Sequence, residues 1–165
     1  LKQPDIINNF SRILDPTLLG EDTLKQLFEL RLILEMGMAD FLFAHKTQKD
    51  IDELEKIVQD EEATDTGKIR FALDKEIAFH GKLYQMSRNV TLQGFQNLLL
   101  PVFEYVYMKE TKNHDLDSDH FTGGKFITHR MLLENLKVGT PETFRNAIRR
   151  HLEPHFDHAF KNGNK

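Results

Sequence analysis

The chain has 165 residues, 39% of them hydrophobic and 29% charged, and a formal net charge of −4 at pH 7. This composition is typical of one globular domain with a hydrophobic core, and the acidic charge argues against a nucleic-acid-binding surface. The chain has no cysteine, which excludes disulfides and thiolate metal sites and fits a reducing cytoplasm. It contains no apolar run long enough to cross a membrane, and its first residues do not follow a signal-peptide pattern.

Helical periodicity continues along almost the whole chain, without the alternation that is typical of β-strands. Apolar residues form one stripe over 5–14 and predict a short first helix. Pro16 and Gly20 then indicate a connector. A long helix is expected over 22–44, where apolar residues recur at helical spacing.

The middle of the chain is predicted to continue with two further helices. Thr47 is expected to cap a helix that ends near Val58, with Asp50 at its third position as in a capping box. The acidic stretch over 59–67 is expected to be a loop. The helix that follows holds the segment 76–89.

The last part of the chain is also predicted to be helical. A helix over 91–110 contains Pro101, which is expected to kink it. A polar loop over 111–124 separates it from two final helices, the last capped by Thr140 with Pro141 at its first position. Six or seven helices with mostly short connectors predict an all-α antiparallel bundle.

The helix that holds 76–89 carries two polar residues on its apolar face. Glu76 and His80 lie one turn apart, on the side that also carries Ile77, Leu83 and Tyr84. An ionised carboxylate in an apolar core is unfavourable unless it is paired. These two residues therefore need a partner inside the bundle.

The long helix over 22–44 has the same feature in Arg31 and Glu35, which are four residues apart on its apolar face. One interpretation is an internal salt bridge between them, because buried charges are tolerated when they are paired. The other is that Arg31 presents its guanidinium fork to a bound carboxylate. The sequence leaves both interpretations open.

Two later helices direct histidines to the core. His129 begins an apolar stripe, and His151 lies on the apolar face of the last helix. Each histidine alone is more typical of a hydrogen-bonded core residue than of a ligand. Together with Glu76 and His80, however, they form a ligand set for Zn²⁺, Ni²⁺, Mn²⁺ or Fe²⁺ in a site without thiols. Four such ligands leave coordination positions open for water or a small oxygen ligand.

Three segments of the chain resemble one known family. They are 27–58, with Arg-x-x-x-Glu; 76–92, with Glu-x-x-Phe-His and Ser-x-Asn; and 127–152, with the two later histidines. In this order they are similar to the FCD domain, the C-terminal effector-binding domain of the FadR subfamily of GntR-type bacterial transcription regulators. The resemblance covers roughly residues 24–155.

This resemblance implies a helical bundle that holds a divalent metal through one acidic residue and three histidines. Carried over to this sequence, the four ligands are Glu76, His80, His129 and His151. The family usually has Asp where this chain has Glu76. His155 and His158 share a helix face with His151 but do not fall on ligand positions, so they are expected to be structural or surface residues.

The resemblance also implies a domain organisation. Residues 1–20 are expected to be a linker with a short N-terminal helix, and residues 21–165 the effector-binding domain. The N-terminal winged helix-turn-helix of the family is not expected within this chain. Contacts with DNA are therefore expected only through that domain, in a full-length regulator that forms a homodimer.

These inferences predict a sensor of a small organic acid that performs no catalysis. The acid is expected to take an open coordination position on the ion and to pair with Arg31. The sides of the helices on which they lie predict that the pocket walls are Phe79, Leu83, Phe103 and Tyr107. One alternative is a helical-bundle metalloenzyme that acts on a small carboxylate, which requires a general base beside the ion. Another is an interaction module whose histidines are only hydrogen-bonded.

Overall fold

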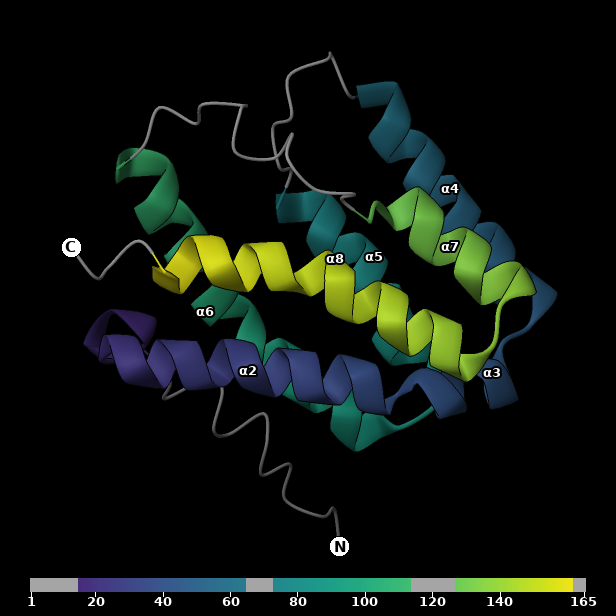
Figure 1. Ribbon diagram of the computed structural model, residues 1–165, viewed down its shortest axis with the longest axis horizontal. Coiled ribbons are helices and arrows are strands. Elements are labelled where there is room, and N and C mark those ends of the chain that lie inside the picture. Colours follow the sequence, from purple (N-terminus) through teal and green to yellow (C-terminus); the bar gives the residue numbers. More distant parts are fainter. Residues whose placement is uncertain (1–14, 65–72, 114–126, 162–165) are drawn as a thin grey trace, which may run out of the picture.

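The structure is a computed structural model that describes residues 15–64, 73–113 and 127–161. Within these ranges it contains helices and no strand, which confirms the predicted all-α bundle. The elements are η1 (Pro16–Leu18), α2 (Glu21–Gly37), α3 (Ala39–His45), α4 (Gln48–Thr64), α5 (Leu73–Met86), α6 (Val90–Asn113), α7 (His129–Val138) and α8 (Pro141–Lys161) (Figure 1). No helix in the described part of the chain is long and apolar enough to span a membrane.

Helix α8 holds the bundle together. It packs against α2 on one side and α7 on the other, and it also contacts α3 and α6. Its chain direction is opposite to that of α2, as the colours along the two helices show (Figure 1). Helix α5 packs against α3, α4 and α6. Helix α7 closes the remaining side by contacting α4 as well as α8.

Two predicted helix starts are confirmed by their capping bonds. At the start of α4, the Thr47 N–H donates to Asp50 Oδ2 over 3.1 Å and the Asp50 N–H donates to Thr47 Oγ1 over 3.2 Å, which is the reciprocal pattern of a capping box. At the start of α8, the Thr143 N–H donates to Thr140 Oγ1 over 3.3 Å, and Pro141 occupies the first helical position.

Two predicted boundaries are wrong. The helix expected over 22–44 is divided at Met38, between Gly37 and Ala39, next to a glycine, which is a weak helix former. Helix α4 continues to Thr64 instead of ending near Val58, so much of the expected 59–67 loop is helical. Contacts with α7 hold this additional helical turn in place.

Other predictions lie partly outside the described residues. Helix α6 runs from Val90 to Asn113 with Pro101 inside it, so residues 111–113 of the expected 111–124 loop are helical, and the rest of that prediction lies outside the described residues. The helix predicted over 5–14 lies outside the described residues, and the assignment of residues 1–20 to a linker stays a prediction.

The main hydrophobic core is formed by α3, α4, α5, α7 and α8 and is filled by large apolar side chains. Its fully buried members include Leu42, Leu54, Phe79, Leu83, Leu132, Leu133, Leu136, Phe144 and Ile148. Besides Asp50, which pairs with Lys82, five acidic or histidine side chains are nevertheless buried in the described part of the bundle. They are Glu35, Glu76, His80, His129 and His151. Since burying unpaired charges is costly, these five side chains must compensate one another or bind something that does.

Candidate metal centre

Four of these buried residues bring their ligand atoms to one point. Glu76 and His80 extend from successive turns of α5, His129 is the first residue of α7, and His151 lies within α8. One carboxylate oxygen and one nitrogen from each imidazole all lie within 4.8 Å of one another. The four side chains singled out in the sequence therefore meet in space.

Local structure explains how each helix presents its ligand. On α5, the i, i+4 spacing places Glu76 and His80 on the same face. On α7, the Thr128 side chain accepts the N–H of Met131 and so fixes the start of the helix, with His129 as its first residue. The neighbouring Ile127 is buried in the main core and anchors the chain just before this cap.

The Nε2 atoms of the three histidines all face the Glu76 carboxylate. His129 Nε2 lies 2.9 Å from Glu76 Oε1, His151 Nε2 lies 3.5 Å from the same oxygen, and His80 Nε2 lies 3.3 Å from Glu76 Oε2. His80 Nε2 and His151 Nε2 are 3.2 Å apart. The donor atoms thus surround a common centre from three helices.

Each histidine is held from behind through its other nitrogen. His80 Nδ1 lies 2.6 Å from Glu35 Oε2, His129 Nδ1 lies 2.9 Å from Glu61 Oε2, and His151 Nδ1 lies 2.6 Å from the Ile127 carbonyl oxygen. A carbonyl oxygen and ionised carboxylates can only accept, so each Nδ1 donates a proton. We therefore assign the tautomer that leaves the Nε2 lone pair for a metal ion.

This arrangement fits a divalent cation better than it fits an apolar core. With Nδ1 protonated, the facing Nε2 lone pairs of His80 and His151 repel each other unless a cation or a proton lies between them. Despite its short distance to Glu76, His129 Nε2 is buried without a hydrogen-bond partner among the described residues. One carboxylate and three imidazoles are also a common ligand set for divalent transition metals.

The charges around the centre favour a bound cation. Burial alone raises the pKa of Glu76, but His80 and His129 more than offset this and hold its pKa well below the usual range. Burial likewise raises the pKa of Glu35, which His80 and Arg31 lower to about 2. Burial lowers the pKa of His129, yet Glu76 and Glu61 raise it to about 9. Two buried anionic carboxylates thus attract positive charge, whether that is a proton or a metal ion.

Arg31, on α2, is paired within the protein. Its Nε donates to Glu35 Oε1 over 2.7 Å and its Nη2 donates to Glu76 Oε2 over 3.2 Å. Its guanidinium carbon lies 4.8 Å from the centre of the Phe103 ring, which is a cation–π contact. The salt bridge with Glu35, one of the two interpretations that the sequence leaves open, is therefore present, and a second one with Glu76 links Arg31 to the ligand set.

A small cavity of about 20 Å³ adjoins Arg31 and the ligand set. It is lined by Arg31, Glu35, Leu73, Glu76, Ile77, His80, Tyr84, Gln96, Leu100 and Phe103. This volume admits roughly one water molecule, so a larger ligand requires side chains to move.

The predicted pocket walls have different positions in the structure. Phe103 lines the cavity, whereas Phe79 and Leu83 do not, because both belong to the main core. Phe79 stacks on His129, with the ring centres 4.3 Å apart and an interplanar angle of 17°. The side chains of Tyr107, His155 and His158 lie outside the described part of the chain.

Glu61 is a site residue that the sequence reasoning missed. It was assigned to a loop, but it lies in the last turns of α4, where both of its carboxylate oxygens are within 3.1 Å of His129 Nδ1. A signal was present, because Leu54, Val58 and Glu61 follow the i, i+4, i+7 pattern of one helix face. Continuing that stripe past Val58 brings Glu61 to the inner side of α4.

The family model of the FCD domain matches residues 26–154, which is most of the chain. The chain belongs to the FCD domain family. Searches of curated proteins and of solved structures found no match to it.

Proposed function

We propose that this chain is the ligand-sensing domain of a FadR-type regulator of the GntR family, and that it binds a divalent metal and a small organic acid. Membership of the FCD domain family supports the assignment to a regulator. The observation that carries the metal site is the convergence of three Nε2 atoms on Glu76, each imidazole being held by an acceptor at Nδ1.

The metal would be held by the four residues that meet at the centre. These are Glu76, His80, His129 and His151. When bound, Zn²⁺, Ni²⁺, Mn²⁺ or Fe²⁺ supplies positive charge and open coordination positions for an oxygen ligand. The outer acceptors hold the remaining proton on Nδ1, so that loss of the Nε2 proton leaves the tautomer that such an ion requires.

Arg31 is the residue proposed to recognise the acid. It lines the cavity and is the one cationic side chain among the residues that line it. Its fork already binds two carboxylates, so a third carboxylate would have to share it or replace Glu76 as its partner. Because the cavity admits roughly one water molecule, Arg31 and the adjoining Phe103 are expected to move when the acid binds.

Regulation would follow from different affinities of the acid for two arrangements of the bundle. Arg31 on α2, Glu76 on α5, His129 on α7 and His151 on α8 all meet within one connected set of contacts. A change in any of these contacts shifts the helices relative to one another. In a homodimeric full-length regulator, that shift would alter the spacing of the DNA-binding domains.

The same contacts favour binding over catalysis. A metalloenzyme needs a general base beside the activated water. The nearest additional carboxylate, Glu35, is fully buried and is engaged by both Arg31 and His80. Glu61 is directed at His129 from the outer side of the ring. Neither carboxylate is positioned as a free base next to the centre.

Metal analysis of the purified protein tests this proposal. We expect about one divalent ion per chain in the wild type and none in the double variant His80→Ala/His129→Ala. His45→Ala is the matched control, because His45 bonds the Ser87 carbonyl and is not one of the residues that converge at the centre. Equal metal contents in the wild type and the double variant would contradict the site.

A further inference from the structure

The three acceptors behind the histidines differ in their exposure. Glu35 is fully buried behind His80, and the Ile127 carbonyl behind His151 belongs to a buried residue. Glu61 behind His129 is different, because 34% of its side chain is exposed and it lies near the end of α4. The support of His129 therefore comes from the surface of the bundle.

We propose that Glu61 is a positioning residue that sets the metal affinity of the centre by fixing the orientation of the His129 ring. This inference rests on the metal site of the proposed function, but it concerns a residue outside the ligand set. Both Glu61 oxygens approach the same nitrogen, at 2.9 and 3.1 Å from Nδ1. Outer carboxylates of this kind fix the tautomer of a ligating histidine and increase its basicity.

Phe79 and Glu61 constrain His129 in different ways. The Phe79 ring stacks on the imidazole and fixes its plane. Stacking does not determine which edge of the imidazole faces Glu76, since a half-turn of the ring leaves the plane unchanged. After such a turn, a carbon atom would take the place of Nε2. On the outer edge of the ring, the bond from Nδ1 to Glu61 distinguishes the two orientations, and it complements the approach of Nε2 to Glu76 on the inner edge.

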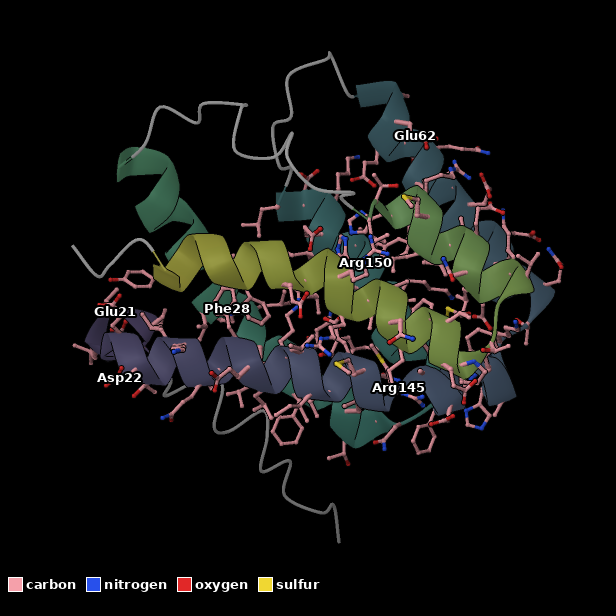
Figure 2. All side chains as sticks on the ribbon, viewed as in Figure 1. Glu21, Asp22, Phe28, Glu62, Arg145 and Arg150 are labelled. Carbon is pink, nitrogen blue, oxygen red and sulfur yellow. The ribbon has the colours of Figure 1, made fainter. Side chains whose placement is uncertain are left out.

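The neighbouring Glu62 provides a matched control. It accepts from Arg130 Nε over 3.0 Å and from Arg130 Nη2 over 2.7 Å, so it also links the end of α4 to the start of α7. Figure 2 shows Glu62 on α4 above the first turns of α7. It has no contact with the ligand set, and removing it tests the effect of the α4–α7 connection alone.

The experiment measures Zn²⁺ affinity by competition with a chromophoric chelator for the wild type, Glu61→Ala, Glu61→Gln and Glu62→Ala. We expect Glu61→Ala to weaken binding about 10- to 100-fold. Glu61→Gln keeps an acceptor but loses the negative charge, so its loss should be smaller. Glu62→Ala should change the affinity by less than about twofold. The Co²⁺-loaded Glu61→Ala protein should also show an altered visible absorption spectrum, because a reoriented His129 changes the coordination.

The outcomes separate this inference from the proposed function. If the wild type binds Zn²⁺ and Glu61→Ala binds it equally well, the positioning role is wrong while the metal site stands. Equal losses in Glu61→Ala and Glu62→Ala would also overturn the role, since the loss would then come from the α4–α7 connection. If the wild type binds neither Zn²⁺ nor Co²⁺, the proposed metal site itself is wrong.

Discussion

Arg31 on α2 and Glu76 on α5 form an ion pair of 3.2 Å inside the bundle, although they are 45 positions apart in the sequence. The same carboxylate also faces three imidazoles, and Arg31 and His80 approach the same oxygen, Oε2. Glu76 therefore joins two parts of the centre, namely the nitrogen ligands and the guanidinium proposed to recognise an acid. Binding of the acid and binding of the metal should consequently influence each other.

Arg31→Ala should destabilise the metal-free protein by about 3 kcal/mol, because it removes a guanidinium that pairs with two buried carboxylates. Urea unfolding in the presence of a chelator measures this loss. The double variant Arg31→Ala/Glu35→Gln should recover part of it, since fewer uncompensated charges remain buried. A loss confined to the range of surface substitutions, below about 0.5 kcal/mol, would contradict the role of Arg31 as the internal counter-ion.

Arg31→Ala should also weaken the binding of small carboxylic acids to the metal-loaded protein. Calorimetry with a panel of such acids measures the change, and circular dichroism checks that the variant is folded. Arg145→Ala is a suitable control, because Arg145 pairs with the exposed Asp40 and does not line the cavity. Unchanged acid affinity in Arg31→Ala would leave Arg31 with a structural role only.

Removal of the metal should lower the thermal stability of the wild type. A ligand at about 100 times its Kd stabilises the native state by about 2.7 kcal/mol, which for a domain of this size corresponds to roughly 5–10 °C in Tm. Differential scanning calorimetry with and without a chelator measures the shift. The double variant His80→Ala/His129→Ala should show no such shift, whereas His45→Ala should retain it.

Glu76→Asp tests the ligand position at which the family resemblance leads us to expect aspartate. In the wild type, the Glu76 carboxylate lies 3.2 Å from Arg31 Nη2 and 2.9 Å from His129 Nε2. The shorter aspartate side chain withdraws the carboxylate from Arg31 or from the imidazoles. We expect the variant to retain metal but to change the ratio of its Zn²⁺ and Ni²⁺ affinities, whereas Glu76→Ala should lose most binding. Calorimetric titration with the two ions measures both effects. Retention of full affinity by Glu76→Ala would exclude Glu76 as a ligand.

Asp50 should make stability depend on acid pH. Burial raises its pKa, but the bonds from Lys82 and Thr47 lower it to about 2 from its ordinary value of 3.8. A lowered native pKa stabilises the fold above pH 3.8, and this contribution is lost as the pH falls towards about 2. The stability difference between the wild type and Asp50→Asn in urea should therefore be largest near neutral pH and smallest near pH 2. The exposed Asp52 on the same helix provides the control variant Asp52→Asn, for which we expect little difference.

The sequence was most informative where local chemistry decides the structure. The Thr47–Asp50 capping box and the Thr140–Pro141 start follow from short-range bonds, and both are present. The convergence of Glu76 with the histidines could be anticipated because polar residues on apolar helix faces must meet a partner. That their ligand atoms meet at one point depends on how α5, α7 and α8 pack together. The apolar face of each single helix does not specify this packing.

The features that the sequence did not predict depend on tertiary contacts. The last turns of α4 have an acidic, loop-like composition, but Glu61 and Glu62 bond to His129 and Arg130 on α7. Helix propensity is a local property of the sequence, so it does not include bonds to such distant partners. Phe79 and Leu83 share an inward face with the ligands, yet core packing takes them away from the cavity. The position of a residue on the apolar face of a helix indicates that its side chain is buried, but it does not show which side chains surround it.

The pairing of His80 with His151 closes a segment of 71 residues in a chain without cysteine. An ion bound between these side chains would act as a cross-link, restricting the chain much as a disulfide does. Unlike a disulfide, this link forms and breaks without electron transfer. The lifetime of the folded domain would then follow the supply of free metal ions in its surroundings. The availability of metal would thus help to set how much of the sensor persists, in addition to the effect of the acid that it detects.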